Sequence, residues 1–124
     1  MKKQFVHSED CDDIEMGVRR EINGSRVYVT PEGNTYPSIT SILGRQPKPG
    51  IEAWKEKVGY QEASRIMKES SALGTMVHSL CEDYLYNEDL QCDDKEAISV
   101  FNRLRFLLGN IDNIQCIEAP LHSD

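Results

Sequence analysis

The sequence has no hydrophobic run long enough to cross a membrane, since none approaches the ~18 apolar residues that a spanning helix needs. No apolar stretch follows Lys2 and Lys3, which argues against a secretory signal peptide there. The four cysteines lack any Cys-x-x-Cys spacing. Free thiols in a reducing compartment are therefore a simpler interpretation than a zinc site built with His7, His78 or His122. We expect a cytoplasmic protein with no membrane partner.

Positive charge is also scarce. Fourteen lysines and arginines stand against twenty-one acidic residues, which gives a formal net charge of -7. This balance argues against a broad surface that binds nucleic acid by bulk electrostatics. It leaves room for an enzyme that binds phosphate in one small site, where acidic residues hold a metal. At 124 residues the chain has room for one domain with one core.

Turn signals and hydrophobic periodicity divide this single domain, 1–124, into four parts. Asn23-Gly24 predicts a hairpin turn, and the alternation over 26–30 predicts a strand. Residues 35–43 read as a short strand that runs into a helical turn. The predicted parts are a polar, acidic N-terminal segment (1–22, with an exposed loop at 8–13), a β-hairpin entry (23–43), a helical region (51–109) and a strand (113–121).

The helical region has an apolar residue every three or four positions, as amphipathic helices do. We expect Gly59 to divide its first part, 51–69, into two pieces. A third helix carries His78. A fourth begins at an Asp93 or Asp94 cap and ends near Leu108.

These elements predict an α/β (α+β) fold with an N-terminal hairpin, about four helices and one late strand. That strand has nothing after it to pair with, so the central sheet looks incomplete and the domain truncated. The same unpaired edge predicts self-association through the terminal strand.

The segment 71–85 holds the most informative polar pattern. Its apolar positions form one helical face, while Thr75, His78 and Glu82 share a different stripe. A histidine and a carboxylate one turn apart can reach the same cation or the same phosphate.

Three blocks in order resemble the PD-(D/E)xK nuclease superfamily, in its RecB-type branch of phage and mitochondrial exonucleases. The first is Tyr28-Val-Thr-Pro-Glu-Gly-Asn-Thr-Tyr-Pro-Ser-Ile-Thr-Ser-Ile-Leu43. The second runs from Trp54 to Glu82 and contains Gly74-Thr-x-x-His78. The third is Glu118-Ala-Pro-Leu-His-Ser123. Together they span about residues 26–123.

This resemblance implies the N-terminal portion of a metal-dependent DNA exonuclease that acts on single-stranded ends. His78 maps to the metal site, Glu118 to the catalytic residues, and the cofactor of the complete enzyme is Mg²⁺ or Mn²⁺. Ser38, Thr40 and Thr75 are the candidate DNA contacts. The family's later Asp and Asp-x-Lys elements have no counterpart after Glu118, so whether the chain is an enzyme by itself stays open. Leu73 stands where the family often has arginine.

Plainer interpretations exist for each of these residues. His78 fits a surface histidine, Glu82 a solvated helix residue, and Ser38 or Thr40 an ordinary helix cap. Two other functions also remain: a non-catalytic single-stranded DNA-binding or inhibitory module, and a small metal-binding protein that uses His78 and Glu82. The nuclease hypothesis alone requires His78 and Glu118 to converge in one cleft near Ser38–Thr40.

Overall fold

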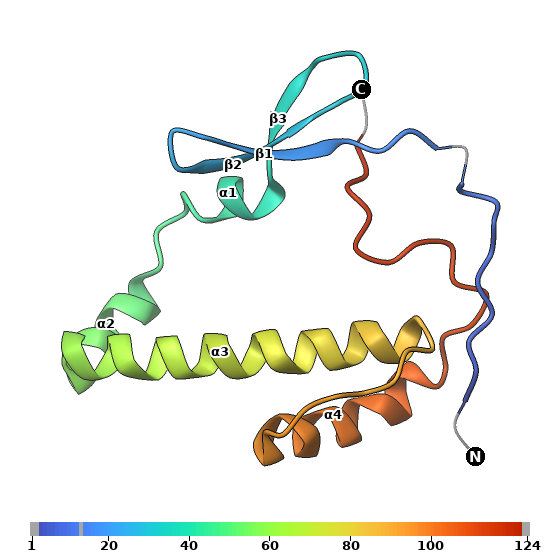
Figure 1. Ribbon diagram of the computed structural model, residues 1–124. Coiled ribbons are helices and arrows are strands. Elements are labelled where there is room, and N and C mark those ends of the chain that lie inside the picture. Colours follow the sequence, from blue (N-terminus) through green and yellow to red (C-terminus); the bar gives the residue numbers. More distant parts are fainter. Residues whose placement is uncertain (1–2, 13, 123–124) are drawn as a thin grey trace.

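The computed structural model describes residues 3–12 and 14–122. It is a mixed α+β structure, with a three-stranded antiparallel sheet and four helices in this part of the chain (Figure 1). The elements follow in the order β1 (Val18–Ile22), β2 (Ser25–Val29), β3 (Thr35–Pro37), α1 (Ile39–Leu43), α2 (Pro49–Val58), α3 (Tyr60–Leu85) and α4 (Lys95–Leu108). Predictions for Met1, Lys2, Asp13, Ser123 and Asp124 lie outside the described residues.

The predicted hairpin turn is confirmed at Asn23 and Gly24, which have φ angles of 52° and 76°. Two positive φ angles in a two-residue loop match the twist of the flanking strands. The turn pairs Ile22 with Ser25 and fixes the register of β1 against β2. The strand β1 therefore occupies the end of the polar N-terminal segment 1–22, where no strand was predicted. A two-residue turn before β2 requires a partner strand on its other side.

The helical region follows the prediction closely, with one difference. Gly59, at φ 92°, separates α2 from α3, and the Asp94 carboxylate caps α4 by accepting from the Ala97 N–H at 2.8 Å. However, the two helices expected over 60–85 are one continuous helix. The predicted division fell near residues 69–71, Glu-Ser-Ser, which include neither proline nor glycine. Serine costs a helix well under ~1 kcal/mol relative to alanine, so the helix continues through them.

The hydrophobic core lies between the C-terminal half of α3 and α4, which run side by side (Figure 1). Tyr84 is its centre: the Phe5 and Phe101 rings pack edge-on against it, with centroids 5.0 Å and 5.5 Å away. The buried members are Phe5, Val77, Leu80, Tyr84, Ala97, Phe101 and Ile114.

The N-terminal segment acts as a strap across this core. Phe5 exchanges two hydrogen bonds with the Asn87 side chain, at 2.7 Å and 2.9 Å. Next to it, the Ile114 N–H donates to the Val6 carbonyl, and Ser8 N–H donates to the Ile114 carbonyl. The strap, defined here as residues 5–8, therefore anchors the chain that leads to Glu118.

The strand predicted over 113–121 is absent. Ile114 makes one parallel bridge to His7, and the residues after it run irregularly. Positive φ angles at Asn113 and Glu118 interrupt an extended conformation, and Pro120 has no N–H to donate. The described residues therefore offer no terminal strand edge, and the self-association predicted from that edge loses its structural basis.

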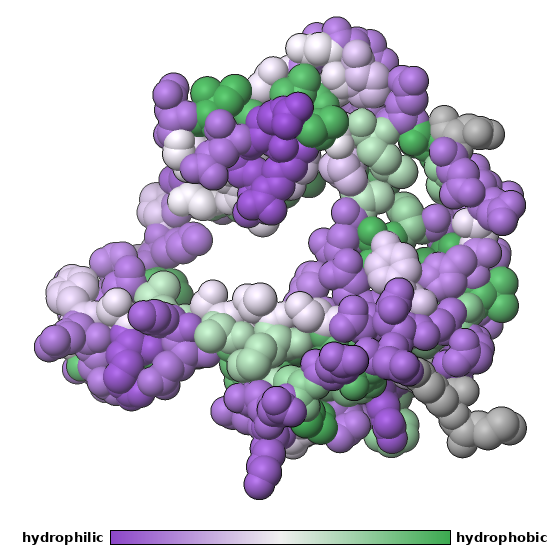
Figure 2. All heavy atoms as spheres, viewed as in Figure 1, coloured by the Kyte–Doolittle hydropathy of each residue, from purple (hydrophilic) through white to green (hydrophobic). Residues whose placement is uncertain are grey.

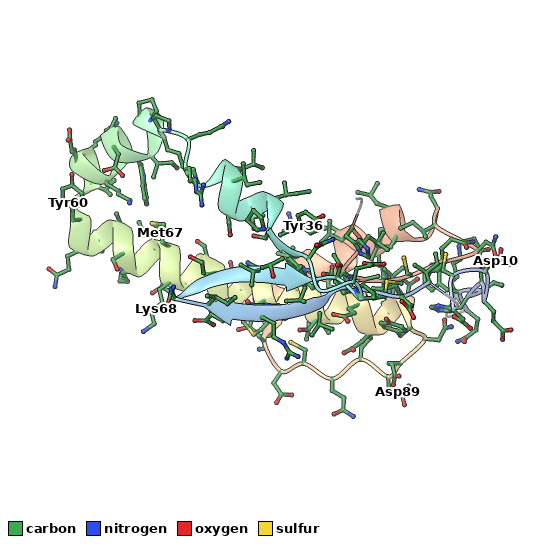
Figure 3. All side chains as sticks on the ribbon, turned by 90° about the horizontal axis from the view of Figure 1, so that it is seen from above. Asp10, Tyr36, Tyr60, Met67, Lys68 and Asp89 are labelled. Carbon is green, nitrogen blue, oxygen red and sulfur yellow. The ribbon has the colours of Figure 1, made fainter. Side chains whose placement is uncertain are left out.

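The sheet lies above α3 and apart from the hydrophobic core (Figure 1). Seen from above, its strands lie over the helix and run along it (Figure 3). The space-filling view shows an opening between the sheet and the long helix (Figure 2). On one side the opening is closed by the final segment, where Gly17 N–H donates to the Pro120 carbonyl at 3.0 Å. None of the helices in the described part is long and apolar enough to cross a membrane.

Candidate functional site

His78 and Glu118 meet at the place where the final segment passes α3. The imidazole Nε2 of His78 lies 3.0 Å from the Oε1 of Glu118. The predicted contact between these two residues is present, but Ser38 and Thr40, which were expected at the same cleft, line an adjoining hollow instead. Both side chains are well exposed, at 59% and 60%. An exposed pair of this kind contributes only about 0–1 kcal/mol to stability, so either side chain can be changed without threatening the fold.

The helix and the strap together bring the two residues into contact. Val77 and Leu80 are buried against α4, which turns His78 onto an exposed face of α3. Ile117 packs against the same core from the final segment. Because the strap holds Ile114 and the core holds Ile117, the next residue, Glu118, comes to lie beside His78.

The backbone of Glu118 is strained. Four non-glycine residues of the described chain have a positive φ, and three of them are asparagines, which tolerate this conformation. Glu118, at φ 52°, is the exception. A left-handed conformation costs an ordinary L-residue about 1–2 kcal/mol, and strained residues gather at functional sites. This strain supports a functional role for the carboxylate.

We expect Glu118→Asn to be more stable than Glu118→Gln by roughly 1 kcal/mol, because asparagine visits the left-handed region more readily. Both variants remove the carboxylate and so lose its contact with His78 alike. Urea unfolding of the two proteins measures the difference. A glutamine variant as stable as the asparagine variant would mean that Glu118 is not strained in solution.

Two connected grooves flank the pair. The helix groove, of about 480 Å³, runs along α3 and the facing side of α4, and the sheet groove, of about 630 Å³, lies between α3, the final segment and the hairpin. His78, Glu82 and Glu118 line both. The sheet groove is also lined by Arg19, Arg26 and Tyr28. The site therefore combines an imidazole, two carboxylates and two guanidinium groups.

Sequence reasoning missed the residues from the hairpin. The two-residue turn at Asn23-Gly24 does set Arg19 opposite Tyr28, but this pairing does not show that the hairpin lies over α3. Arg26 is two residues from Tyr28 and so lies on the same face of the sheet.

Cys81 lies in the helix groove, one turn from His78. Burial raises the pKa of the Cys81 thiol. A thiol that resists ionisation is a poor nucleophile and a poor metal ligand. The cysteines at 11, 81, 92 and 116 are all free, as expected; the first three are half-buried and Cys116 is exposed.

The three predicted DNA contacts are not gathered at the pair. Ser38 caps α1, accepting from the Ser41 N–H at 3.1 Å, and its hydroxyl also lies 3.2 Å from that of Thr40. Both line a hollow that adjoins the sheet groove through Arg26 and Tyr28. Thr75 donates to the Ser71 carbonyl and lines a separate hollow on α3, away from His78.

The described residues do not hold a metal by themselves. Within 3–12 and 14–122, no group of three histidine, cysteine or acidic side chains has an arrangement that could hold a metal ion, although His78, Glu82 and Glu118 line the same grooves. Mg²⁺ requires an octahedral set of mainly oxygen ligands, whereas His78 and Glu118 contact one another and offer one nitrogen and one carboxylate. The pair fits part of a metal site and leaves most of the coordination to other groups.

Comparisons of this chain with protein-family models, curated proteins and solved structures found no match.

Proposed function

We propose that this chain forms the N-terminal part of a metal-dependent DNA exonuclease of the PD-(D/E)xK type, phage-encoded and acting in the host cytoplasm. Glu118 is its catalytic carboxylate and His78 a ligand of the Mg²⁺ or Mn²⁺ ion. Hydrolysis forms one P–O bond from water and breaks another, so the site must accept a proton and offset negative charge. The remaining metal ligands come from groups beyond the described residues and from the substrate phosphate.

The observation that carries this proposal is the contact between His78 and Glu118. These two positions come from separate sequence blocks of the nuclease resemblance, and a plain surface histidine gives no reason for the contact. The strain at Glu118 and the arginines of the sheet groove support the same assignment. A carboxylate beside guanidinium groups suits a site that receives an anionic phosphodiester.

A second candidate is a non-catalytic module that binds single-stranded DNA. The incomplete set of metal ligands in the described chain favours it. The two candidates differ in one respect: a nuclease site draws a divalent ion to His78 when a phosphodiester is present, whereas a binding module does not.

Nuclear magnetic resonance with Mn²⁺ separates these candidates. We expect Mn²⁺ and a single-stranded oligonucleotide together to broaden the His78 ring signals, because substrate phosphates supply oxygen ligands that the chain lacks. Glu118→Gln should abolish the broadening. The His7 ring serves as the internal control, since it stacks on Tyr86 and bonds to the Leu85 carbonyl.

Equal broadening at His7 and His78 would contradict the metal assignment. Oligonucleotide binding without any broadening would favour the non-catalytic module. A third outcome is that Mn²⁺ binds without any oligonucleotide and that Glu82→Gln abolishes this binding. The chain would then be a small metal-binding protein. Under the proposal the 124-residue chain digests no labelled single-stranded DNA with Mg²⁺ or Mn²⁺, and robust His78-dependent digestion would show that the whole site lies within it.

A further inference from the structure

The hairpin presents two chemically different faces. On one face the register sets Arg19 opposite Tyr28, Tyr28 opposite Tyr36, and Arg26 opposite Glu21. Arg19, Arg26, Tyr28 and Tyr36 are called the Arg–Tyr face below. The other face carries Arg20 opposite Val27, together with smaller and aliphatic side chains. Strand periodicity therefore gathers two cations, two aromatic rings and the carboxylate of Glu21 on one side of a small sheet.

The Arg–Tyr face looks into the opening above α3. Arg19, Arg26 and Tyr28 line the sheet groove together with His78 and Glu118. Tyr36 continues this lining in the adjoining hollow. Figure 2 shows the opening between the sheet and α3.

The two arginines are available to a ligand. Within the described residues, neither Arg19 nor Arg26 makes an ion pair or a side-chain hydrogen bond, and both are exposed. By contrast, Arg65 on α3 is paired with Glu62 and Glu69. Arg19 and Arg26 differ from the other unpaired arginines in lining the sheet groove beside His78 and Glu118. Their guanidinium groups are open to an anion there, next to the carboxylates of Glu21, Glu82 and Glu118.

We infer that the Arg–Tyr face is a binding platform for single-stranded DNA, which it holds across the opening so that a phosphodiester reaches His78 and Glu118. Arg19 and Arg26 contact phosphates, and Tyr28 and Tyr36 stack on bases. Interleaved cations and aromatic rings recognise a single strand, because its bases are free to stack. Duplex DNA hides its bases and does not meet this requirement. This inference rests on the proposed function for the cleavage of the bound strand, but the binding of the strand needs neither metal nor catalysis.

The test is fluorescence anisotropy with a labelled oligo-deoxythymidine of about 12 nucleotides, within the ~4–16-nucleotide sites of single-strand binders, in excess EDTA. Two phosphate contacts predict a slope of log K against log salt of about -1.4. Arg19→Gln and Arg26→Gln should each reduce the steepness by about 0.7. Arg20→Gln, on the opposite face of the same strand, should leave affinity and slope unchanged.

The aromatic contacts have their own variants. Tyr28→Leu should weaken binding by roughly tenfold through lost stacking, whereas Tyr28→Phe keeps the ring and should bind normally. Glu118→Gln should strengthen binding slightly in EDTA, since it removes a negative charge from the path of the strand.

Three results would overturn the platform: no binding of the oligonucleotide, equal binding of duplex DNA, or a loss in Arg20→Gln as large as in Arg19→Gln. Circular dichroism of each variant excludes misfolding as the cause. The outcome is separable from that of the Mn²⁺ experiment. Normal binding of the oligonucleotide in EDTA without Mn²⁺ broadening at His78 would support the platform and contradict the nuclease. Mn²⁺ broadening at His78 without oligonucleotide binding to the Arg–Tyr face would support the metal site and contradict the platform.

Discussion

Replacing Phe101 with alanine should lower the free energy of unfolding by about 3–5 kcal/mol, the usual range for truncating a buried phenylalanine. Phe101 is 3% exposed and packs edge-on against Tyr84. It lies where α4 meets α3, and this contact forms most of the described core. A loss of this size is a large part of the 5–15 kcal/mol that stabilises an ordinary domain.

Phe106 provides a matched control on the same helix. Its side chain is 74% exposed, so Phe106→Ala should change the free energy of unfolding by no more than about 0.5 kcal/mol. Chemical denaturation followed by circular dichroism measures both variants. A larger loss in Phe106→Ala than in Phe101→Ala would mean that α4 presents its other face to α3.

Asn87→Ala should cost about 2–5 kcal/mol, although the side chain is only partly buried. Asn87 makes two hydrogen bonds to the Phe5 backbone, each worth about 0.5–1.5 kcal/mol. It also has a φ of 61°, which asparagine tolerates but which costs alanine about 1–2 kcal/mol. Losing both effects should release the strap, expose the Phe5 ring and loosen Ile114.

Asn87→Gly separates these two effects, because glycine accepts the positive φ but cannot make the hydrogen bonds. It should be less destabilising than Asn87→Ala by about 1 kcal/mol. Denaturant unfolding gives the stabilities, and amide hydrogen exchange at Phe5 reports the strap directly. Unchanged protection of the Phe5 amide in Asn87→Ala would show that the strap is held by other contacts.

Local sequence signals predicted most of the elements, because the deciding residues act on their neighbours. Asn23-Gly24 dictates its turn, Gly59 separates two helices, and Asp94 caps α4. Contacts between distant residues explain what was not predicted. Burial of Phe5 depends on Asn87, far along the chain. In a polar N-terminal segment, nothing local signals that contact.

The site, too, was predicted where local sequence motifs decide and missed where contacts between distant residues decide. Sequence blocks predicted the contact of His78 with Glu118, but assigned Glu118 to a strand that does not form. A strand forms only where a neighbouring strand pairs with its backbone hydrogen-bonding groups. Among the described residues the final segment has no such neighbour around Glu118, and its path is fixed by the contacts of Ile117 with the core and of Ile114 with the strap. Arg19 was missed because its role depends on the way the hairpin lies over α3, which pairing within the hairpin does not determine.

The most direct measurement is the nuclear Overhauser spectrum of the labelled chain around the His78 ring. Because Nε2 of His78 lies 3.0 Å from Oε1 of Glu118, we predict cross-peaks between the imidazole protons and the side-chain methylene protons of Glu118. Asn87→Ala should weaken these cross-peaks by releasing the strap. A His78 ring with cross-peaks only to its neighbours on α3, and none to Glu118, would contradict the site.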